Sequence, residues 1–159
     1  MLAEGAAEAL HALREAGFLL IAASNQPAAA KGTATLDDLR GVHDRVAELL
    51  AAEGVELDDW RYCFHHPDGI VPELSGACGC RKPEPGMILD GAEANDVELA
   101  SSWMVGDSDN DVEAGRRAGV RTLLVANPQT AHRRTDPCAH AIVRNLSDAA
   151  GIILDSRDR

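Results

Sequence analysis

Residues 18–23 form a continuous apolar run, Phe-Leu-Leu-Ile-Ala-Ala, that follows an amphipathic helical pattern. A strand that is apolar on both faces is buried on both sides, which is typical of a parallel sheet covered by helices. The helical pattern before it spans 2–16 and ends at Gly17, and the polar sequence Ser-Asn-Gln-Pro follows it at 24–27. This order predicts a fold in which functional groups follow the carboxyl ends of parallel strands.

The alternation of strands and helices continues along the chain. Thr35, with Asp38 three residues later, predicts the start of a second helix. The inner stripe of that helix is expected to contain Leu36, Leu39, Val46, Leu49 and Leu50. Further strands are predicted at 60–64, 102–105, 121–125 and 141–143, and further helices at 87–95, 110–118 and 147–154. The predicted fold class is α/β, a Rossmann-like doubly wound parallel sheet. It forms a single domain over 1–159, with an inserted loop at 63–80 and a C-terminal extension at 126–159.

The charge of the chain limits its partners. The 26 acidic residues outnumber the 15 basic ones, for a net charge of −11. Nucleic acids and anionic membranes attract basic surfaces, so neither is an expected partner, whereas a small anionic substrate needs only a few local cations. No apolar run is long enough to span a membrane, and the N-terminal residues lack the pattern of a secretory signal. A cytoplasmic location is therefore expected, where cysteines serve as metal ligands or free thiols rather than disulfides.

Two short chelating pairs predict a metal site. Twelve residues separate the pairs, whose members are Cys63 and His65, and Cys78 and Cys80. Three thiolates and one imidazole favour tetrahedral zinc, and four protein ligands leave no position for a catalytic water, so the site is expected to be structural. The alternative is a set of unrelated thiols. His66 is a second candidate ligand, expected to face solvent or substrate, and Cys138 is expected to be a plain buried residue.

An acidic loop joins a predicted strand to a predicted helix, with carboxylates at Asp107, Asp109 and Asp111. The spacing resembles a calcium loop, but Val112 stands where that loop needs glycine and Ala118 where it needs glutamate. A magnesium site is the better interpretation, with Asp107 as direct ligand and Asp111 binding the ion or orienting one of its waters. The alternative is a helix cap with a solvated acidic first turn.

Groups able to bind phosphate follow the metal pairs and the first strand. Arg81 and Lys82 come directly after Cys80, in a segment stiffened by two prolines. Ser24 and Asn25 follow the apolar run and offer a hydroxyl, an amide and backbone N–H groups. Taken singly, the basic pair can be a solvated patch and the polar pair a turn cap.

In this order, the motifs resemble the haloacid dehalogenase superfamily of phosphohydrolases. Ser24 matches the hydroxyl of the second motif, Lys82 the lysine of the third, and Asp107 with Asp111 the acidic pair of the fourth. The run C-x-H…C-x-C-R-K-P-x-P-G-M at 63–87 resembles the branch of heptose 1,7-bisphosphate 7-phosphatases and histidinol phosphatases. The twelve-residue gap between the metal pairs is similar to the heptose type.

The resemblance implies magnesium-dependent hydrolysis of a small phosphosugar, with a structural zinc. The catalytic residues would be Ser24, Lys82 and Asp107, and the substrate-binding residues would be Ser24, Asn25, Lys31, Arg81 and Lys82. Lys31 stands where the family usually has an arginine that contacts the distal part of the substrate, so the identity of the phosphosugar depends on this position.

One departure from the family pattern concerns the chemistry itself. The family's first motif, D-x-D-G-T on a central strand, supplies the nucleophile and the general acid–base, but the first aspartate of this chain is Asp37. The expectation is a sheet without its first central strand, in a chain that is truncated or inactive as it stands. A second copy or an N-terminal segment would complete the sheet. The alternatives are a catalytically silent phosphosugar-binding or interaction protein and a histidinol-phosphate phosphatase.

Overall fold

The computed structural model describes residues 1–135 and 138–157, whose strands form two parallel sheets. In the first, β1 (Ile21–Asn25) pairs with β2 (Asp59–Cys63). In the second, β4 (Arg121–Val125) lies between β3 (Trp103–Gly106) and β5 (Ala141–Val143). No ladder joins β1 to β3 within the described ranges. The predicted parallel α/β fold is confirmed, and its sheet is divided where the resemblance places the family's first strand.

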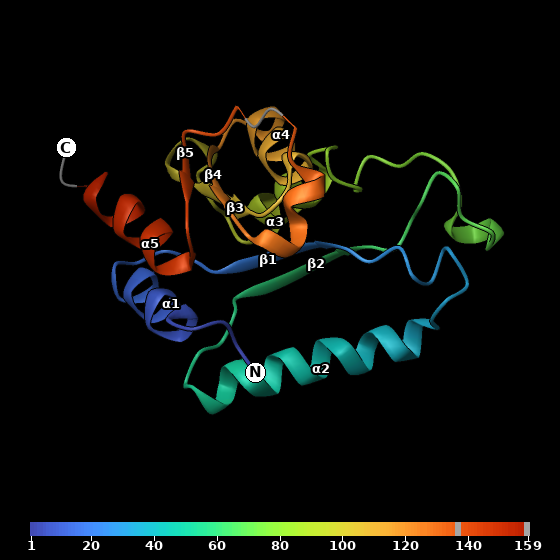
Figure 1. Cartoon of the computed structure of the whole chain (residues 1–159), viewed down its shortest axis with the longest axis horizontal. Helices are drawn as coiled ribbons and strands as arrows, with labels where there is room; N and C mark the ends of the chain where they lie inside the picture. The colour runs from blue at the N-terminus through green and yellow to red at the C-terminus, as the bar shows by residue number, and fades with distance from the viewer. Residues whose placement is uncertain (136–137, 158–159) are drawn as a thin grey trace.

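Helices cover both faces of the strands (Figure 1). They are α1 (Ala6–Glu15), α2 (Leu36–Ala52), α3 (Gly86–Ala94), α4 (Asp109–Ala118) and α5 (Leu146–Asp155). On one face, α3 packs against β1 and β2 while α4 packs against β3 and β4. On the other face, α5 contacts β3, β4 and β5, and α1 packs on α5. Three short 3₁₀ turns, η1 (Pro72–Leu74), η2 (Leu99–Ser101) and η3 (Pro128–Arg133), lie in the connections.

The second helix begins as predicted but packs less than predicted. The Thr35 hydroxyl accepts from the Asp38 N–H at 3.1 Å, and the Asp38 carboxylate accepts from the Thr35 N–H at 2.8 Å, which completes a capping box. Leu50 is buried, but Leu36 and Val46 are 41% and 37% exposed. The predicted inner stripe is therefore wrong at these two positions, because α2 buries only the residue near its C-terminal end.

The C-terminal part of the chain belongs to the core. Val143 on β5 and Ala149 and Ile153 on α5 are buried in one cluster with Leu13 of α1. The predicted extension at 126–159 is described except at 136–137 and 158–159, and its described part packs against β3 and β4. Cys138 is exposed, so the prediction that it is buried is wrong. In sequence it lies between η3 and β5.

Among the residues described, no helix is both long and apolar enough to cross a membrane.

Close packing of α4 on the second sheet requires a glycine at position 115. A Cβ atom there would lie 2.6 Å from Cγ2 of Thr122 and 2.8 Å from Cβ of Met104. We expect Gly115→Ala to lower the free energy of unfolding by about 1–3 kcal/mol, because the added methyl overpacks this contact. Gly41→Ala is the matched control, since nothing lies within 4 Å of its Cβ position in the exposed middle of α2. It should raise stability by about 0.5–1 kcal/mol. Urea denaturation measures both, and equal stabilities would contradict this packing.

Candidate functional site

The four predicted zinc ligands come together at the end of β2. Their ligand atoms all lie within 4.8 Å of one another, although Cys63 and His65 are separated in sequence from Cys78 and Cys80. Sγ of Cys63 is 3.5 Å from Sγ of Cys78 and 3.8 Å from Nδ1 of His65. A tetrahedral zinc with Zn–S bonds of about 2.3 Å places its ligand atoms about 3.7 Å apart. The donor set and its spacing therefore fit zinc with no open coordination position.

Two of the three thiols in this cluster, Cys63 and Cys80, sit in surroundings that oppose their ionisation. Burial raises the pKa of Cys63, and burial together with the neighbouring thiols raises that of Cys80. Three thiolates within a few ångströms of one another repel, so they need a divalent cation to hold them deprotonated. The chemistry of the cluster thus favours a structural metal site over reactive thiols.

The zinc cluster is joined to the start of α3 by a close backbone contact. The Gly86 N–H donates to the Gly79 carbonyl at 2.9 Å, and a Cβ at position 86 would overlap that carbonyl oxygen. The segment 81–85 between them is therefore held at both ends, by the cluster and by α3. This fixes the backbone of Lys82, which is the residue that links the cluster to the rest of the site.

Lys82 connects the carboxyl ends of β1 and β3. Its backbone N–H donates to Oδ1 of Asn25 and its carbonyl accepts from Nδ2 of Asn25, both at 3.0 Å. Its ammonium group donates to the Ala23 carbonyl at 2.6 Å and lies 2.5 Å from Oδ1 of Asp111. The lysine is only 8% exposed. A buried ammonium is stable only when it is paired and hydrogen-bonded, so these contacts fix the positions of both strand ends.

Asp111 links Lys82 to the acidic loop. Its Oδ2 accepts from the backbone N–H groups of Asp107 and Ser108, at 3.1 and 3.0 Å, and from the Ser108 hydroxyl at 2.7 Å. Asp111 is therefore both the third residue of a capping box on α4 and the partner of a buried cation. Its two oxygens already have four contacts, which suits a residue that orients the loop.

Asp107 is held by two residues that the sequence analysis missed. Nδ2 of Asn127 lies 3.4 Å from Oδ2 of Asp107, and the Thr130 hydroxyl donates to the Asp107 carbonyl at 3.1 Å. In the described part of the chain, Oδ1 of Asp107 has no hydrogen-bond partner. Asn127 and Thr130 follow β4, so a polar residue after a strand was the available signal, as at Asn25.

Of the remaining predicted residues, Ser24 lies on β1, whereas Arg81 and His66 are next to the zinc ligands in the sequence. Ser24 lies on β1 beside Asn25, and its hydroxyl accepts from Gln26 at 3.1 Å. Arg81 instead donates to the carbonyl of His65 at 3.2 Å. Burial, followed by the charges of Arg81 and Lys31, lowers the pKa of His66. His66 is outside the four-ligand cluster.

The zinc cluster generates a direct test. Purified protein should contain one zinc per chain, and Cys78→Ala should lose the metal and much of its stability, since structural zinc contributes folding free energy directly. Cys138→Ala is the matched control, because that thiol is exposed and outside the cluster. Metal analysis and thermal unfolding measure the two variants. Zinc retained at full stoichiometry by Cys78→Ala would contradict the ligand set.

The Lys82–Asp111 pair generates a second test. Asp111→Ala should cost about 3–5 kcal/mol, because it leaves a buried ammonium unpaired. Thr35→Ala, which removes the exposed capping box of α2, should cost about 1 kcal/mol. The double variant Lys82→Met with Asp111→Ala should lose less than the sum of its single variants, because it removes the uncompensated charge. Additive losses in urea denaturation would show that the two side chains do not interact.

Comparisons with known proteins agree with this arrangement. The HAD-hydrolase-like family model matches residues 79–149, which span the lysine segment, the acidic loop and β5. A D-glycero-α-D-manno-heptose-1,7-bisphosphate 7-phosphatase of Photorhabdus laumondii is 39% identical over 86% of this chain and 73% of its own length. A D-glycero-β-D-manno-heptose-1,7-bisphosphate 7-phosphatase of Yersinia pestis is 35% identical, covering 91% of this chain and 78% of its own.

A solved structure extends the agreement to three dimensions. The D,D-heptose 1,7-bisphosphate phosphatase of B. bronchiseptica, crystallised with magnesium and phosphate, superimposes with a TM-score of 0.82. It is 31% identical, and the match covers 98% of this chain and 85% of that one. With the sequence motifs, the zinc cluster and the joined strand ends, these likenesses show that the chain belongs to the heptose 1,7-bisphosphate 7-phosphatase family of the HAD superfamily.

Proposed function

We propose that this chain forms the body of a magnesium-dependent phosphatase that removes the 7-phosphate of D-glycero-D-manno-heptose 1,7-bisphosphate. The observation that carries the proposal is the bonded series from Asn25 through Lys82 and Asp111 to Asp107. It holds an ammonium and a carboxylate at one edge of the strands, with Ser24 next to Asn25 on β1, and this edge is where open α/β sheets bind their ligands.

Each side chain has a distinct role in this proposal. Two of the three donors of the Lys82 ammonium are taken by Ala23 and Asp111, and the third is available to a phosphate oxygen. The Ser24 hydroxyl binds a second oxygen. Asp107 offers Oδ1 to magnesium, which would neutralise charge on the phosphate during its transfer. Asp111 positions the loop and supports the metal site.

The second phosphate of the substrate suits the cations near the zinc loop. Lys31 and Arg81 lie close enough to His66 to lower its pKa. The Lys82 ammonium instead contacts the Ala23 carbonyl and Asp111. A sugar that carries phosphates at both ends needs a second cationic site besides Lys82. We therefore assign Lys31 and Arg81 to the distal phosphate. We also propose that the protein is cytoplasmic, because thiolate ligands stay reduced in that compartment.

Attack on phosphorus requires a carboxylate that these site residues do not supply. No aspartate precedes Asp37 in the 159 residues, and Asp107 and Asp111 are engaged in the roles above. In this proposal a D-x-D-G-T strand between β1 and β3 brings the nucleophile and the general acid–base to Lys82.

The test compares the 159-residue form with one that carries an N-terminal segment bearing D-x-D-G-T. With magnesium, the extended form should hydrolyse heptose 1,7-bisphosphate, and the shorter form should be slower by several orders of magnitude, because binding groups alone give little turnover. Assaying both anomers and histidinol phosphate distinguishes the substrate. Equal turnover by the two forms would mean that another residue is the nucleophile. Absence of turnover in both would favour a silent phosphosugar-binding protein.

A further inference from the structure

Asn127 is held in one orientation beside Asp107. β3 and β4 pair in parallel, with Gly106 opposite Leu124, so the residues that follow the two strands meet at the same edge. Asn127 caps η3, because its Oδ1 accepts from the Gln129 N–H at 3.0 Å. Since Oδ1 is used in this way, Nδ2 is the amide atom that faces Oδ2 of Asp107, at 3.4 Å.

The backbone of Asn127 is fixed as well. Its N–H donates to the Val125 carbonyl at 2.8 Å, and its carbonyl accepts from the Arg134 guanidinium at 3.1 Å. The Thr130 hydroxyl lies 3.2 Å from the same carbonyl and 3.1 Å from the carbonyl of Asp107. The Asn127 amide therefore extends from a well-held backbone, and it can keep its place when the Asp107 carboxylate binds a ligand.

This contact makes the two carboxylate oxygens of Asp107 unequal. Oδ2 faces a hydrogen-bond donor, whereas Oδ1 has no hydrogen-bond partner among the described residues. A cation bound to both oxygens would lie beside Oδ2, close to the amide hydrogens of Asn127, whose positive partial charge repels it. The geometry therefore favours a cation that binds Asp107 through Oδ1 alone.

Binding through a single oxygen suits Mg²⁺ better than Ca²⁺. Mg²⁺ needs near-ideal octahedral geometry at about 2.0–2.1 Å and keeps several of its waters. Ca²⁺ takes roughly six to eight ligands at about 2.3–2.6 Å and accepts both oxygens of one carboxylate. We propose that Asn127 is a positioning residue that holds Asp107 in its single-oxygen orientation and thereby raises the preference of this site for Mg²⁺ over Ca²⁺. The inference rests on the proposed function only in placing the metal ion on Asp107.

Two other roles for Asn127 agree less well with its contacts. A direct metal ligand would turn its amide oxygen to the ion, but Oδ1 faces the Gln129 N–H and Nδ2 faces Asp107. A helix cap alone would need only the bond to Gln129. Aspartate at position 127 separates the cap from the positioning role, because a carboxylate still caps η3 but has no N–H for Asp107.

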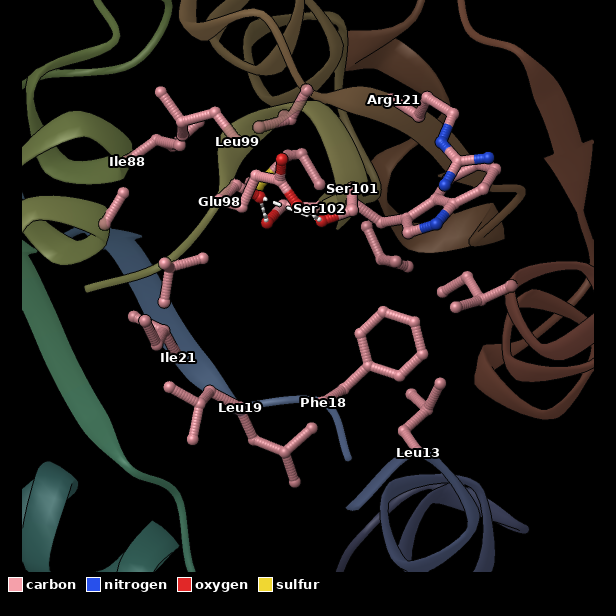
Figure 2. Close-up of a pocket in the computed structure, with 18 of the residues that line it drawn as sticks. Leu13, Phe18, Leu19, Ile21, Ile88, Glu98, Leu99, Ser101, Ser102 and Arg121 are labelled. Carbon is pink, nitrogen blue, oxygen red and sulfur yellow. Dashed lines mark hydrogen bonds between the residues drawn. The ribbon is translucent and has the colours of Figure 1, made fainter. Parts of the chain in front are cut away.

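A second place where a ligand could enter is the cavity between β1 and β3, but its walls suit a cation poorly. The cavity has a volume of about 810 Å³, and Figure 2 shows that apolar side chains such as Leu13, Phe18 and Ile21 form much of its wall. Neither Asp107 nor Asn127 is among the residues that line it. Metal binding that depends on Asp107 therefore takes place at the strand ends, outside this cavity.

The test titrates the zinc-loaded protein with Mg²⁺ and, separately, with Ca²⁺, and follows the NMR shifts of the Asp107 and Ser108 amides, which report on this site alone. Asn127→Ala should weaken Mg²⁺ binding about 10–100-fold, as is typical when a metal ligand loses its hydrogen-bond partner, and should weaken Ca²⁺ binding less. Asn127→Asp should lower the ratio of Mg²⁺ affinity to Ca²⁺ affinity by about tenfold or more, because it removes the donor and adds an oxygen that suits Ca²⁺. Thermal unfolding shows that each variant is folded.

Asn145→Asp is the matched control. Asn145 caps α5 through the Asp148 N–H and follows β5, which β4 separates from β3. Its substitution adds the same charge at another cap and should leave the affinity ratio unchanged. An unchanged ratio in Asn127→Asp, an equal fall in Asn145→Asp, or an unaltered protein that binds Ca²⁺ as tightly as Mg²⁺ would overturn the inference.

The positioning role and the catalytic proposal fail separately. A lower affinity ratio in Asn127→Asp, without turnover by the extended form, would support the positioning role and refute the catalytic proposal. Turnover by the extended form, with a ratio that Asn127→Asp leaves unchanged, would refute the positioning role alone.

Discussion

The buried contact between Lys82 and Asp111 is the interaction on which the rest of the site depends. It holds an ammonium group against a carboxylate at 2.5 Å, with the Ala23 carbonyl as a further partner. The two sheets share no ladder in the part of the chain that the structure describes, so this contact sets how their carboxyl ends face each other. A buried charge pair is costly to desolvate and adds little stability by itself. Its value here is positional, because it joins one strand end to the loop that carries Asp107.

The zinc cluster also helps to fix the position of Lys82, through the backbone of the segment that carries it. The cluster holds the loop at 63–80, and the hydrogen bond from the Gly86 N–H to the Gly79 carbonyl joins this loop to the start of α3. Lys82 lies between these two fixed points, so its side chain has little freedom. Two of the four ligands, Cys78 and Cys80, come four and two residues before Lys82 in the sequence, and the closed ligand set leaves no open position for chemistry. A structural metal can thus determine activity by fixing a backbone, and its loss is expected to disturb substrate binding together with stability.

Short sequence patterns predicted those features that depend on residues close together in the sequence. Thr35 with Asp38 indicated a helix start, and the cysteine and histidine spacing indicated a metal cluster. The apolar run at 18–23 indicated a strand buried on both faces, but the residues of β1 are only half-buried and Leu19 is exposed. The strand itself is displaced to Ile21–Asn25, because its register is set by pairing with β2. The spacing of apolar residues identifies the apolar face of a helix but not whether another element packs on it, and Leu36 and Val46 are in fact exposed.

Asn127 and Thr130 were missed because their contacts to Asp107 cross at least 20 residues of sequence. Cys138 was predicted to be buried from its residue type alone, although its side chain is exposed.

A crystal structure of the extended form with magnesium and phosphate would show whether these groups form one phosphate site. We expect a phosphate in contact with the Ser24 hydroxyl and the Lys82 ammonium, a magnesium ion on Oδ1 of Asp107, and the D-x-D-G-T strand between β1 and β3. Asp111 should keep its contact with Lys82. A phosphate bound only beside Lys31 and Arg81, or a magnesium ion held away from Asp107, would contradict the account.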